Sequence, residues 1–334
     1  MVKYAGILLL LVALLSGCEK AFFPDEPAQD PETTFESLWQ VVDERYAFFE
    51  FKGVDWDAVR TQYRSEINSE TNTVELFYTC ADMLNELRDG HVNLSAPFDY
   101  SRYDGFYRNS PQNFNYTIID RNYFQGNQIL TGAFQHWLID SVGYVYYPSM
   151  GRTAGASSID FMMQLYAPYK GLIVDVRDNG GGNPANGFRI AQRWMSERTK
   201  IMDVVMKEGA GDNDFSDPNP VHLEPAGTFY DKPIVVLTNR SCFSATNDFA
   251  AVCKVLPNVT LMGDTTGGGG GIPAEVELPN GWFLRLSVSQ TLLPNGFNIE
   301  DGIPPDVQVD MNALDEAGGV DTILEEALEF INSQ

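Results

Sequence analysis

The sequence predicts an α/β fold in which a helical section precedes the sheet. First, apolar residues recur at helical spacing through residues 34–88. Second, beyond residue 140 short apolar runs rich in Val, Ile and Leu alternate with helical stretches, as expected for strands that helices bury on both faces. Third, 44% of the 334 residues are hydrophobic, which is enough to build the cores of one or two domains.

Residues 1–17 have the features of a lipoprotein signal peptide. Lys3 supplies a positive charge, and residues 5–15 form an apolar segment that is too short to span a bilayer. The Leu-Ser-Gly sequence before Cys18 is typical of a lipobox, which predicts cleavage before Cys18 and attachment of lipid to it; a plain signal peptide is the alternative. Residues 18–32 are polar and contain three prolines, which predicts a tether between the anchor and the folded part.

The rest of the chain divides into two sections. Residues 33–90 are predicted to be helical, with apolar stripes over residues 34–52, 56–67 and 72–88 that we interpret as core faces rather than as a groove for a partner. Residues 91–334 are predicted to form the α/β domain, because the pattern there changes from helical spacing to alternating strands and helices.

The α/β domain opens with residues 92–130, which are rich in Tyr, Asn and Phe and predict loops and short strands. The domain contains no internal repeat and no low-complexity segment. We expect strands at residues 141–150, 172–174, 201–206, 233–238, 258–262, 274–278 and 282–289, and helices at residues 155–167, 185–197 and 244–256.

Charge and cysteine content exclude several classes of function. The formal net charge of −24 excludes a general attraction to nucleic acid or to an anionic membrane surface. Such acidity is typical of a solvated exported protein, and a preference for basic substrates is the functional alternative. Cys80, Cys242 and Cys253 lack the spacing of metal ligands, so the sequence predicts no metal site, no disulfide framework and no cofactor.

Two glycine-containing segments carry residue types suited to catalysis. Gly90 permits a sharp chain reversal that would present His91 at a cleft, although a lone histidine is more often structural. Residues 175–182 (Asp-Val-Arg-Asp-Asn-Gly-Gly-Gly) join an apolar strand to a helix, and N–H groups there are suited to hold an anion or a developing oxyanion. An ordinary tight turn is the alternative, and the sequence lacks the signature of a phosphate-binding loop.

Two further segments carry hydroxyl and carboxyl groups. Ser244 follows an apolar strand and precedes a helix, so its hydroxyl would be exposed beside the helix N-terminus, which stabilises negative charge. The alternative is that Ser244 only caps the helix. Residues 299–307 form a proline-containing turn with three carboxylates, one of them Glu300; by itself this turn is typical of many surfaces.

Together and in this order, the four segments resemble those of the tail-specific, or C-terminal-processing, serine peptidase family. The resemblance rests on Asp89-Gly90-His91, on residues 175–182, on Phe243-Ser244-Ala245 and on residues 302–306 (Gly-Ile-Pro-Pro-Asp), and it covers roughly residues 34–310. It implies a crotonase-like or Clp-protease-like core of stacked strand–strand–helix units. It also implies acyl transfer on a protein or peptide substrate.

The resemblance assigns roles to individual residues. Ser244 would attack the peptide carbonyl, and the backbone N–H groups of Ala245 and of Gly181 or Gly182 would form the oxyanion hole. Many members of the family use a Ser–Lys dyad, but Gly269 stands about where that lysine belongs.

The missing lysine makes the chain similar to the tricorn-like branch of the family, which uses histidine and glutamate. This similarity implies His91 as the general base and Glu300 as its acidic partner. Gly90 replaces the hydroxyl residue that precedes the histidine in that branch, so Asp89 is an alternative group for orienting the ring.

The chain departs from the family pattern in two further respects. The acidic residue usual three positions after the nucleophile is Asn247 here, with Asp248 next to it, and residues 92–170 contain no recognisable PDZ module.

We therefore expect an exported serine endopeptidase, anchored by lipid in the bacterial cell envelope. Two other functions stay open on the sequence. A non-catalytic binding protein would have a deep apolar pocket lined by the Tyr- and Phe-rich residues 98–147. A hydrolase of another ester or amide would use the same site, with Cys242 as an alternative nucleophile.

Overall fold

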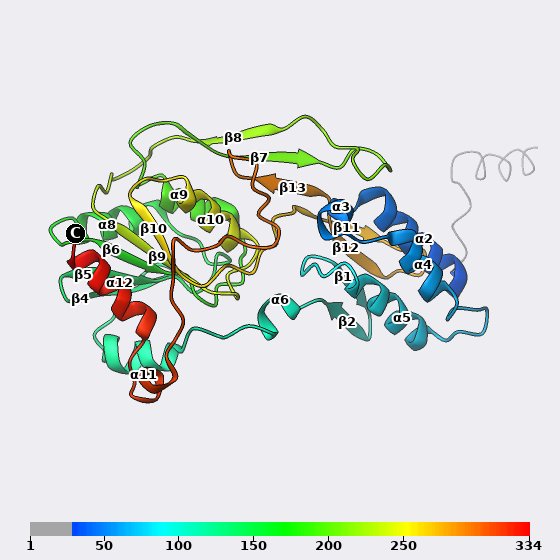
Figure 1. Cartoon of the computed structure of the whole chain (residues 1–334), viewed down its shortest axis with the longest axis horizontal. Helices are drawn as coiled ribbons and strands as arrows, with labels where there is room; N and C mark the ends of the chain where they lie inside the picture. The colour runs from blue at the N-terminus through cyan, green and yellow to red at the C-terminus, as the bar shows by residue number, and fades with distance from the viewer. Residues whose placement is uncertain (1–28) are drawn as a thin grey trace, which may run out of the picture.

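The computed structural model describes residues 29–334, so the predicted signal peptide, Cys18 and the predicted tether as far as residue 28 lie outside the described residues. The described part contains three β-sheets and three hydrophobic cores. Figure 1 shows the N-terminal helices at one end of the molecule and the largest sheet with its own helices at the other. No helix in residues 29–334 combines the length and the apolar character that crossing a membrane requires.

The predicted N-terminal helices are present, and a break at residues 46–48 divides the first predicted stretch into two. The first helix begins at Pro31 because Asp30 accepts a hydrogen bond from a backbone N–H of the first turn. The last begins with a capping box formed by Asn72 and Glu75. The helices are α2 (Pro31–Arg45), α3 (Phe49–Lys52), α4 (Trp56–Arg64) and α5 (Thr73–Asn85).

The N-terminal helices pack against a four-stranded antiparallel sheet of order β11-β12-β1-β2. Phe35, Leu38 and Phe77 from the helices meet Leu284 and Leu286 from the sheet in one buried core. Two of the strands follow the helices directly in the sequence, and two come from much later in the chain. They are β1 (Asn93–Ala96), β2 (Asp99–Arg102), β11 (Pro273–Glu277) and β12 (Phe283–Ser287).

The central sheet has seven strands in the order β14-β10-β9-β6-β5-β4-β3. The four pairs from β5 to β14 are parallel, and the remaining two pairs are antiparallel. The strands are β3 (Ile129–Thr131), β4 (Phe134–Ile139), β5 (Val142–Tyr146), β6 (Leu172–Asp175), β9 (Ile234–Thr238), β10 (Val259–Gly263) and β14 (Val307–Gln308). The apolar runs at residues 172–174 and 233–238 form its middle, as the sequence predicts.

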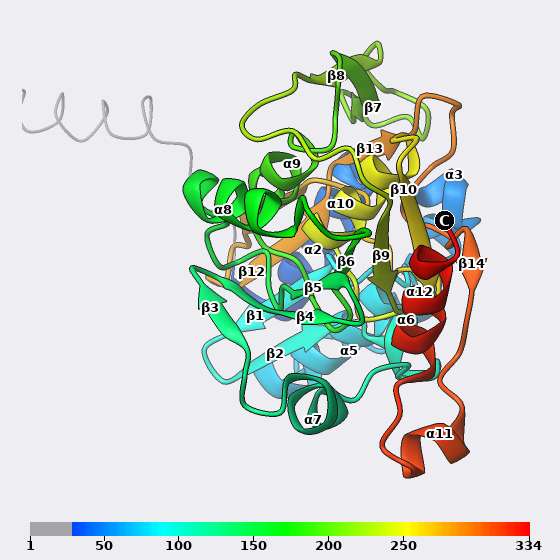
Figure 2. The same ribbon diagram turned by 90° about the vertical axis from the view of Figure 1, so that its left-hand side faces the viewer.

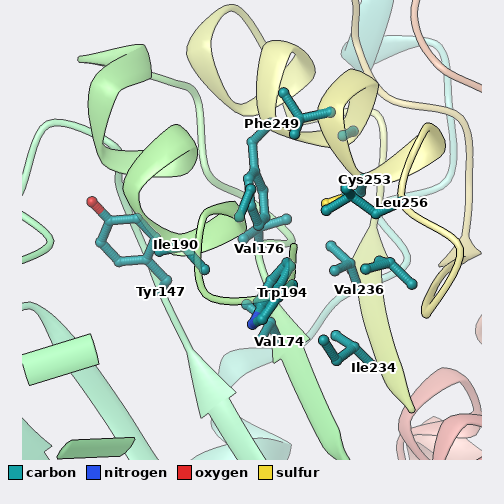
Figure 3. Close-up of a cluster of buried hydrophobic side chains, with 14 of the residues drawn as sticks. Tyr147, Val174, Val176, Ile190, Trp194, Ile234, Val236, Phe249, Cys253 and Leu256 are labelled. Carbon is teal, nitrogen blue, oxygen red and sulfur yellow. The ribbon is translucent and has the colours of Figure 1, made fainter. Parts of the chain in front are cut away.

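Helices cover both faces of the central sheet (Figure 2). Because side chains alternate along a strand, Val174 and Val236 point to one face, where they pack with Trp194 and Phe249 (Figure 3), and neighbouring residues point to the other. The first face carries α8 (Ala156–Tyr166), α9 (Pro184–Ala191) and α10 (Ala245–Lys254), and the second carries α12 (Thr322–Asn332), which the sequence analysis did not predict.

A third, three-stranded antiparallel sheet has the order β13-β7-β8. The predicted strand at residues 201–206 therefore lies outside the central sheet, and the predicted strand at residues 282–289 is divided between two sheets. The strands of this third sheet are β7 (Thr199–Met206), β8 (Asn219–Leu223) and β13 (Ser289–Leu292). The connections contain α6 (Gly105–Arg108), α7 (Tyr116–Ile118), the π-helix η1 (Ile119–Phe124) and α11 (Ala313–Ala317).

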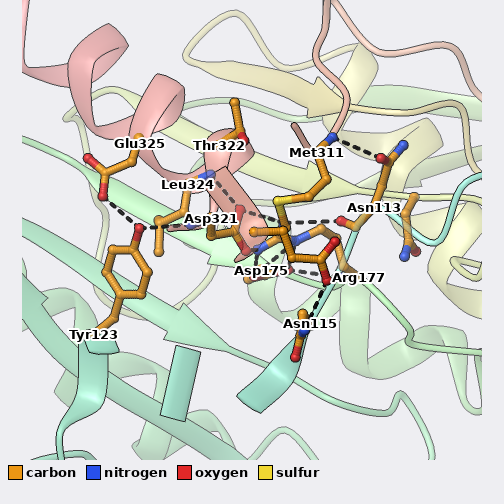
Figure 4. A network of polar contacts seen from close by, with 12 residues as sticks. Asn113, Asn115, Tyr123, Asp175, Arg177, Met311, Asp321, Thr322, Leu324 and Glu325 are labelled. Carbon is orange, nitrogen blue, oxygen red and sulfur yellow. Dashed lines mark hydrogen bonds and ion pairs between the residues drawn. The ribbon is translucent and has the colours of Figure 1, made fainter. Parts of the chain in front are cut away.

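A buried ion-pair network fixes the end of β6 (Figure 4). The Arg177 guanidinium lies 2.6 Å from Asp175 Oδ2 and 2.9 Å from Asp321 Oδ2, and none of the three side chains is exposed. Arg177 Nη1 also donates to the carbonyl of Asn113 at 3.2 Å, and Asp321 caps α12 by accepting from the Leu324 N–H. The network therefore joins β6, the Asn113 loop and α12.

We predict that Arg177→Met destabilises the protein by about 3–5 kcal/mol, because two buried carboxylates lose their counter-charge. Denaturant unfolding measures the change. The control is Arg198→Met, whose ion pair with Glu224 is well exposed and is expected to contribute about 0–1 kcal/mol. Similar losses in both variants would contradict the prediction.

Candidate active site

The carboxyl ends of β6 and β9 place two of the predicted segments next to each other. The strands are parallel neighbours, with Asp175 opposite Leu237, so the chain leaves both strands at the same edge of the sheet. From β6 it enters the glycine-rich turn at residues 179–182. From β9 it enters the turn that ends at Ser244.

Ser244 adopts a strained backbone conformation immediately before α10. Its φ is 56° and its ψ is −124°, a region that non-glycine residues rarely occupy. The Ser244 N–H donates to the carbonyl of Gly268 at 2.9 Å, and the side chain makes no cap hydrogen bond. The alternative that Ser244 only caps the helix is therefore wrong. Its Oγ instead lies 2.9 Å from Nε2 of His91.

His91 lies in the turn between α5 and β1, in the other half of the molecule. Its ring is buried and stands edge-on to the ring of Phe243, with 4.8 Å between centroids. Burial lowers the pKa of His91 to about 4, although the nearby charge of Asp89 acts in the opposite direction. The imidazole is therefore neutral at pH 7 and free to accept a proton.

Asp89 orients the backbone of His91 and not its ring. One carboxylate oxygen accepts the His91 N–H at 2.7 Å, and the other accepts the Ser287 hydroxyl at 2.9 Å. Within residues 29–334, Nδ1 of His91 has no partner with good hydrogen-bond geometry, although the Gly271 backbone lies near enough to favour protonation of the ring. The alternative that Asp89 holds the ring by a direct hydrogen bond is therefore not realised.

Aromatic packing explains the two glycines that depart from the family pattern. A Cβ at Gly90 would lie 2.7 Å from the ring of Phe106 and 2.8 Å from that of Phe243. These rings stack on each other with 4.5 Å between centroids. A Cβ at Gly269 would lie 2.6 Å from the Phe243 ring, and the φ of +80° favours glycine. The stacked pair thus excludes a hydroxyl side chain before His91 and a lysine at position 269.

The predicted oxyanion-hole residues lie beside Ser244, but they are not equivalent. The Gly181 N–H donates to Asn179 Oδ1 at 3.1 Å, so it is already occupied. Gly181 instead permits close approach, since a Cβ there would lie 2.9 Å from that of Ser244. Gly182 and Ala245 line one cavity of about 210 Å³ together with Ser244. Of the two predicted glycines, Gly182 is thus the one suited to pair with Ala245 as a donor.

Glu300 lies near the site without contacting His91 by a hydrogen bond within the described part of the chain. Its Oε1 is 3.0 Å from Lys52 Nζ, and its Oε2 accepts the Gly270 N–H at 2.8 Å. Burial raises the pKa of Glu300 and the charge of Asp89 adds to this effect, whereas the Lys52 ammonium at 3.0 Å favours the ionised carboxylate. The structure therefore brings together the serine and histidine of the predicted triad, while Glu300 is held by a lysine.

Lys52 is a site residue that the sequence analysis missed. Its side chain is 5% exposed, and its Nζ contacts Glu300, Asp301 at 3.5 Å and the Arg88 carbonyl at 3.2 Å. Burial alone would lower the pKa of Lys52, but the surrounding carboxylates raise it, so the amine stays protonated. No local pattern marks this lysine, because its partner comes from near the other end of the chain.

Cys242 is unsuited to be the nucleophile. It is buried, its Sγ donates to the Val176 carbonyl at 3.0 Å, and burial raises the pKa of its thiol. Within residues 29–334, no three His, Cys, Asp or Glu side chains are grouped so that they could hold a metal ion.

Comparison with known sequences finds similarity to processing peptidases. Peptidase family S41 matches residues 141–309, and the tricorn protease C1 domain matches residues 27–85. The chloroplastic carboxyl-terminal-processing peptidase 3 of Arabidopsis thaliana is 26% identical over 221 residues, which are 64% of this chain and 40% of that protein. The chloroplastic C-terminal processing peptidase of Tetradesmus obliquus is 31% identical over 175 residues, which are 52% of this chain and 36% of that protein. The chain thus spans less than half the length of these curated relatives.

Solved structures extend the similarity to nearly the whole described chain. A candidate peptidase from Parabacteroides merdae is 43% identical with a TM-score of 0.88, over 91% of this chain and 97% of that one. Mature CPAF has a TM-score of 0.70 at 14% identity, over 91% of this chain and 98% of that one. This similarity supports the fold alone. Because the family match extends over half of the sequence, the chain belongs to peptidase family S41, the family of the tail-specific, C-terminal-processing peptidases.

Proposed function

We propose that this protein is a serine endopeptidase in which Ser244 is the nucleophile and His91 the general base. The observation that carries the proposal is the 2.9 Å contact between Ser244 Oγ and His91 Nε2, made by residues from opposite halves of the molecule. A neutral imidazole at this distance can take the hydroxyl proton as Oγ attacks a peptide carbonyl.

The oxyanion that forms in this step is stabilised by backbone groups. Ala245 and Gly182 line the cavity beside Ser244, so we assign their N–H groups as the donors, and the N-terminus of α10 adds a positive electrostatic potential. The protonated His91 then donates to the departing amine, and a water molecule hydrolyses the acyl-enzyme with the same base.

Carboxylates support the imidazolium through charge. Asp89 is the negative group that favours protonation of His91, so we assign it the larger share of this stabilisation. Glu300 holds the glycine loop at residues 268–271 in place through Gly270, and Lys52 balances its charge. This division of roles replaces a direct hydrogen-bonded triad.

The binding-protein alternative is less well supported. It requires a deep apolar pocket lined by the aromatic residues of positions 98–147. Six of the thirteen Tyr and Phe rings in this range are instead buried in the hydrophobic cores, namely Phe114, Phe124, Phe134, Tyr144, Tyr146 and Tyr147. A Ser–His contact has no role in such a protein, so the peptidase is the better supported function.

We predict that Ser244→Ala and His91→Ala each abolish cleavage of an unfolded protein such as casein, measured with residues 19–334 and with circular dichroism to check folding. The first variant lacks the nucleophile and the second lacks its base. Cys242→Ala is the matched control, because its thiol is buried away from the reaction, and it is expected to cleave normally. Cleavage that survives in Ser244→Ala would exclude the proposed site.

We predict that kcat/KM for an uncharged peptide substrate keeps its value as the pH is lowered through 6.5 and falls only near pH 4, by about tenfold per pH unit below it. The reason is that the lowered pKa of His91 leaves the base unprotonated down to about pH 4. The unfolded chain binds this proton near pH 6.5, so stability declines between these values and folding must be monitored in parallel. A decline in kcat/KM centred near pH 6.5 in the folded enzyme would contradict the prediction.

We further propose that lipid on Cys18 anchors the protein in the bacterial cell envelope, on the strength of the lipobox-like sequence and the apolar segment before it. Labelling of the full chain with a fatty-acid analogue in a bacterial host is expected to mark the wild type and not Cys18→Ala. Equal labelling of both would exclude this anchor.

A further inference from the structure

The cavity beside Ser244 has a carboxylate on its wall that the proposed mechanism does not use. This cavity, of about 210 Å³, is lined by Ser244, Ala245 and Asp248 of the α10 segment and also by Ile272 and Arg285. Asp248 lies in the first turn of α10, which begins directly after Ser244, and both residues line this cavity. The carboxylate therefore faces the same space as the nucleophile.

Asp248 has no counter-charge within the described residues. Burial raises the pKa of Asp248 to about 7, and no charge of another described residue contributes to this shift. Arg285 of β12 is directed elsewhere: it donates to Asn93 Oδ1 at 3.1 Å and is among the charges that act on His91. Asp248 is only half-buried, and a cation bound in the cavity would give its carboxylate a partner.

The rest of the cavity suits an alkyl chain that leads to this carboxylate. Pro184, Ile272 and Pro273 contribute apolar walls, and the glycines at positions 269–271 leave room because they lack side chains. Lysine and arginine combine an apolar stem with a terminal cation, so they match both parts of the cavity. The formal net charge of −24 additionally attracts basic substrates.

We propose that this cavity binds a lysine or arginine side chain of the substrate, at the residue whose carbonyl Ser244 attacks, with Asp248 as its counter-ion. The proposal rests on the proposed peptidase function and specifies its substrate class. It makes Asp248 a specificity-determining residue that takes no part in the bond-breaking step.

The test compares two peptides that are identical except for lysine or norleucine at the residue before the scissile bond. Norleucine keeps the alkyl stem and lacks the charge. At pH 8 we expect the wild type to show a lysine-to-norleucine ratio of kcat/KM of about tenfold or more, and Asp248→Asn to lower this ratio by about tenfold. Glu275→Gln is the matched control: it removes one exposed negative charge from β11, close to Pro273 of the cavity wall, and should keep the ratio. A ratio that is the same in wild type and Asp248→Asn overturns the proposal.

Binding to Ser244→Ala, followed by fluorescence anisotropy, separates this proposal from the peptidase function. If the lysine peptide binds about tenfold more tightly than the norleucine peptide, and Ser244→Ala/Asp248→Asn loses this preference, the recognition site stands even for a chain that cleaves nothing. Equal affinity for both peptides overturns the recognition site even if the wild type is an active peptidase.

Discussion

The parallel pairing of β6 with β9 is the constraint on which the site depends. It sends the glycine-rich turn and the nucleophile turn out of the same edge of the sheet, and buried apolar residues on both faces prevent the strands from slipping. Arg177 then fixes the end of β6, while the buried side chain of Asn179 joins the turns to α10. It does so by accepting hydrogen bonds from the N–H of Gly181 and the hydroxyl of Thr246 at 3.1 and 2.7 Å.

The part of the molecule built from the N-terminal helices and the four-stranded sheet forms half of the site. It contributes His91 from the end of the helices and Lys52 from α3. The core that holds these residues also contains β12, which arrives late in the chain, so Ser287 can bind Asp89 through its hydroxyl. The two halves meet through aromatic contacts, where Phe243 lies against His91 on one side and Phe106 on another.

Burial sets the protonation states at the site. Removing water destabilises the charged form of any group, so it lowers the pKa of His91 and raises those of Glu300 and Asp248. Burial thus keeps the imidazole of His91 neutral, and it makes the ionised carboxylate of Asp248 less stable unless a cation binds beside it. The pKa of Lys52 is raised although its side chain is buried, because the charges of three nearby carboxylates outweigh the effect of burial.

The sequence by itself determined the elements whose signals are local. Apolar spacing, caps and short Val- and Ile-rich runs specified the N-terminal helices and the middle of the central sheet, and turn chemistry singled out Ser244, His91 and the glycines. The family pattern added Glu300 as a candidate partner of the histidine. Only the tertiary structure decided which of these groups touch. It places His91 within hydrogen-bond distance of Ser244 and pairs Glu300 with Lys52. It also directs the Gly181 N–H to the side chain of Asn179, to which it donates a hydrogen bond. It also showed why positions 90 and 269 are glycine, since the rings that exclude a side chain there come from distant segments. Contacts between residues far apart in the chain depend on packing, and no local spacing records them.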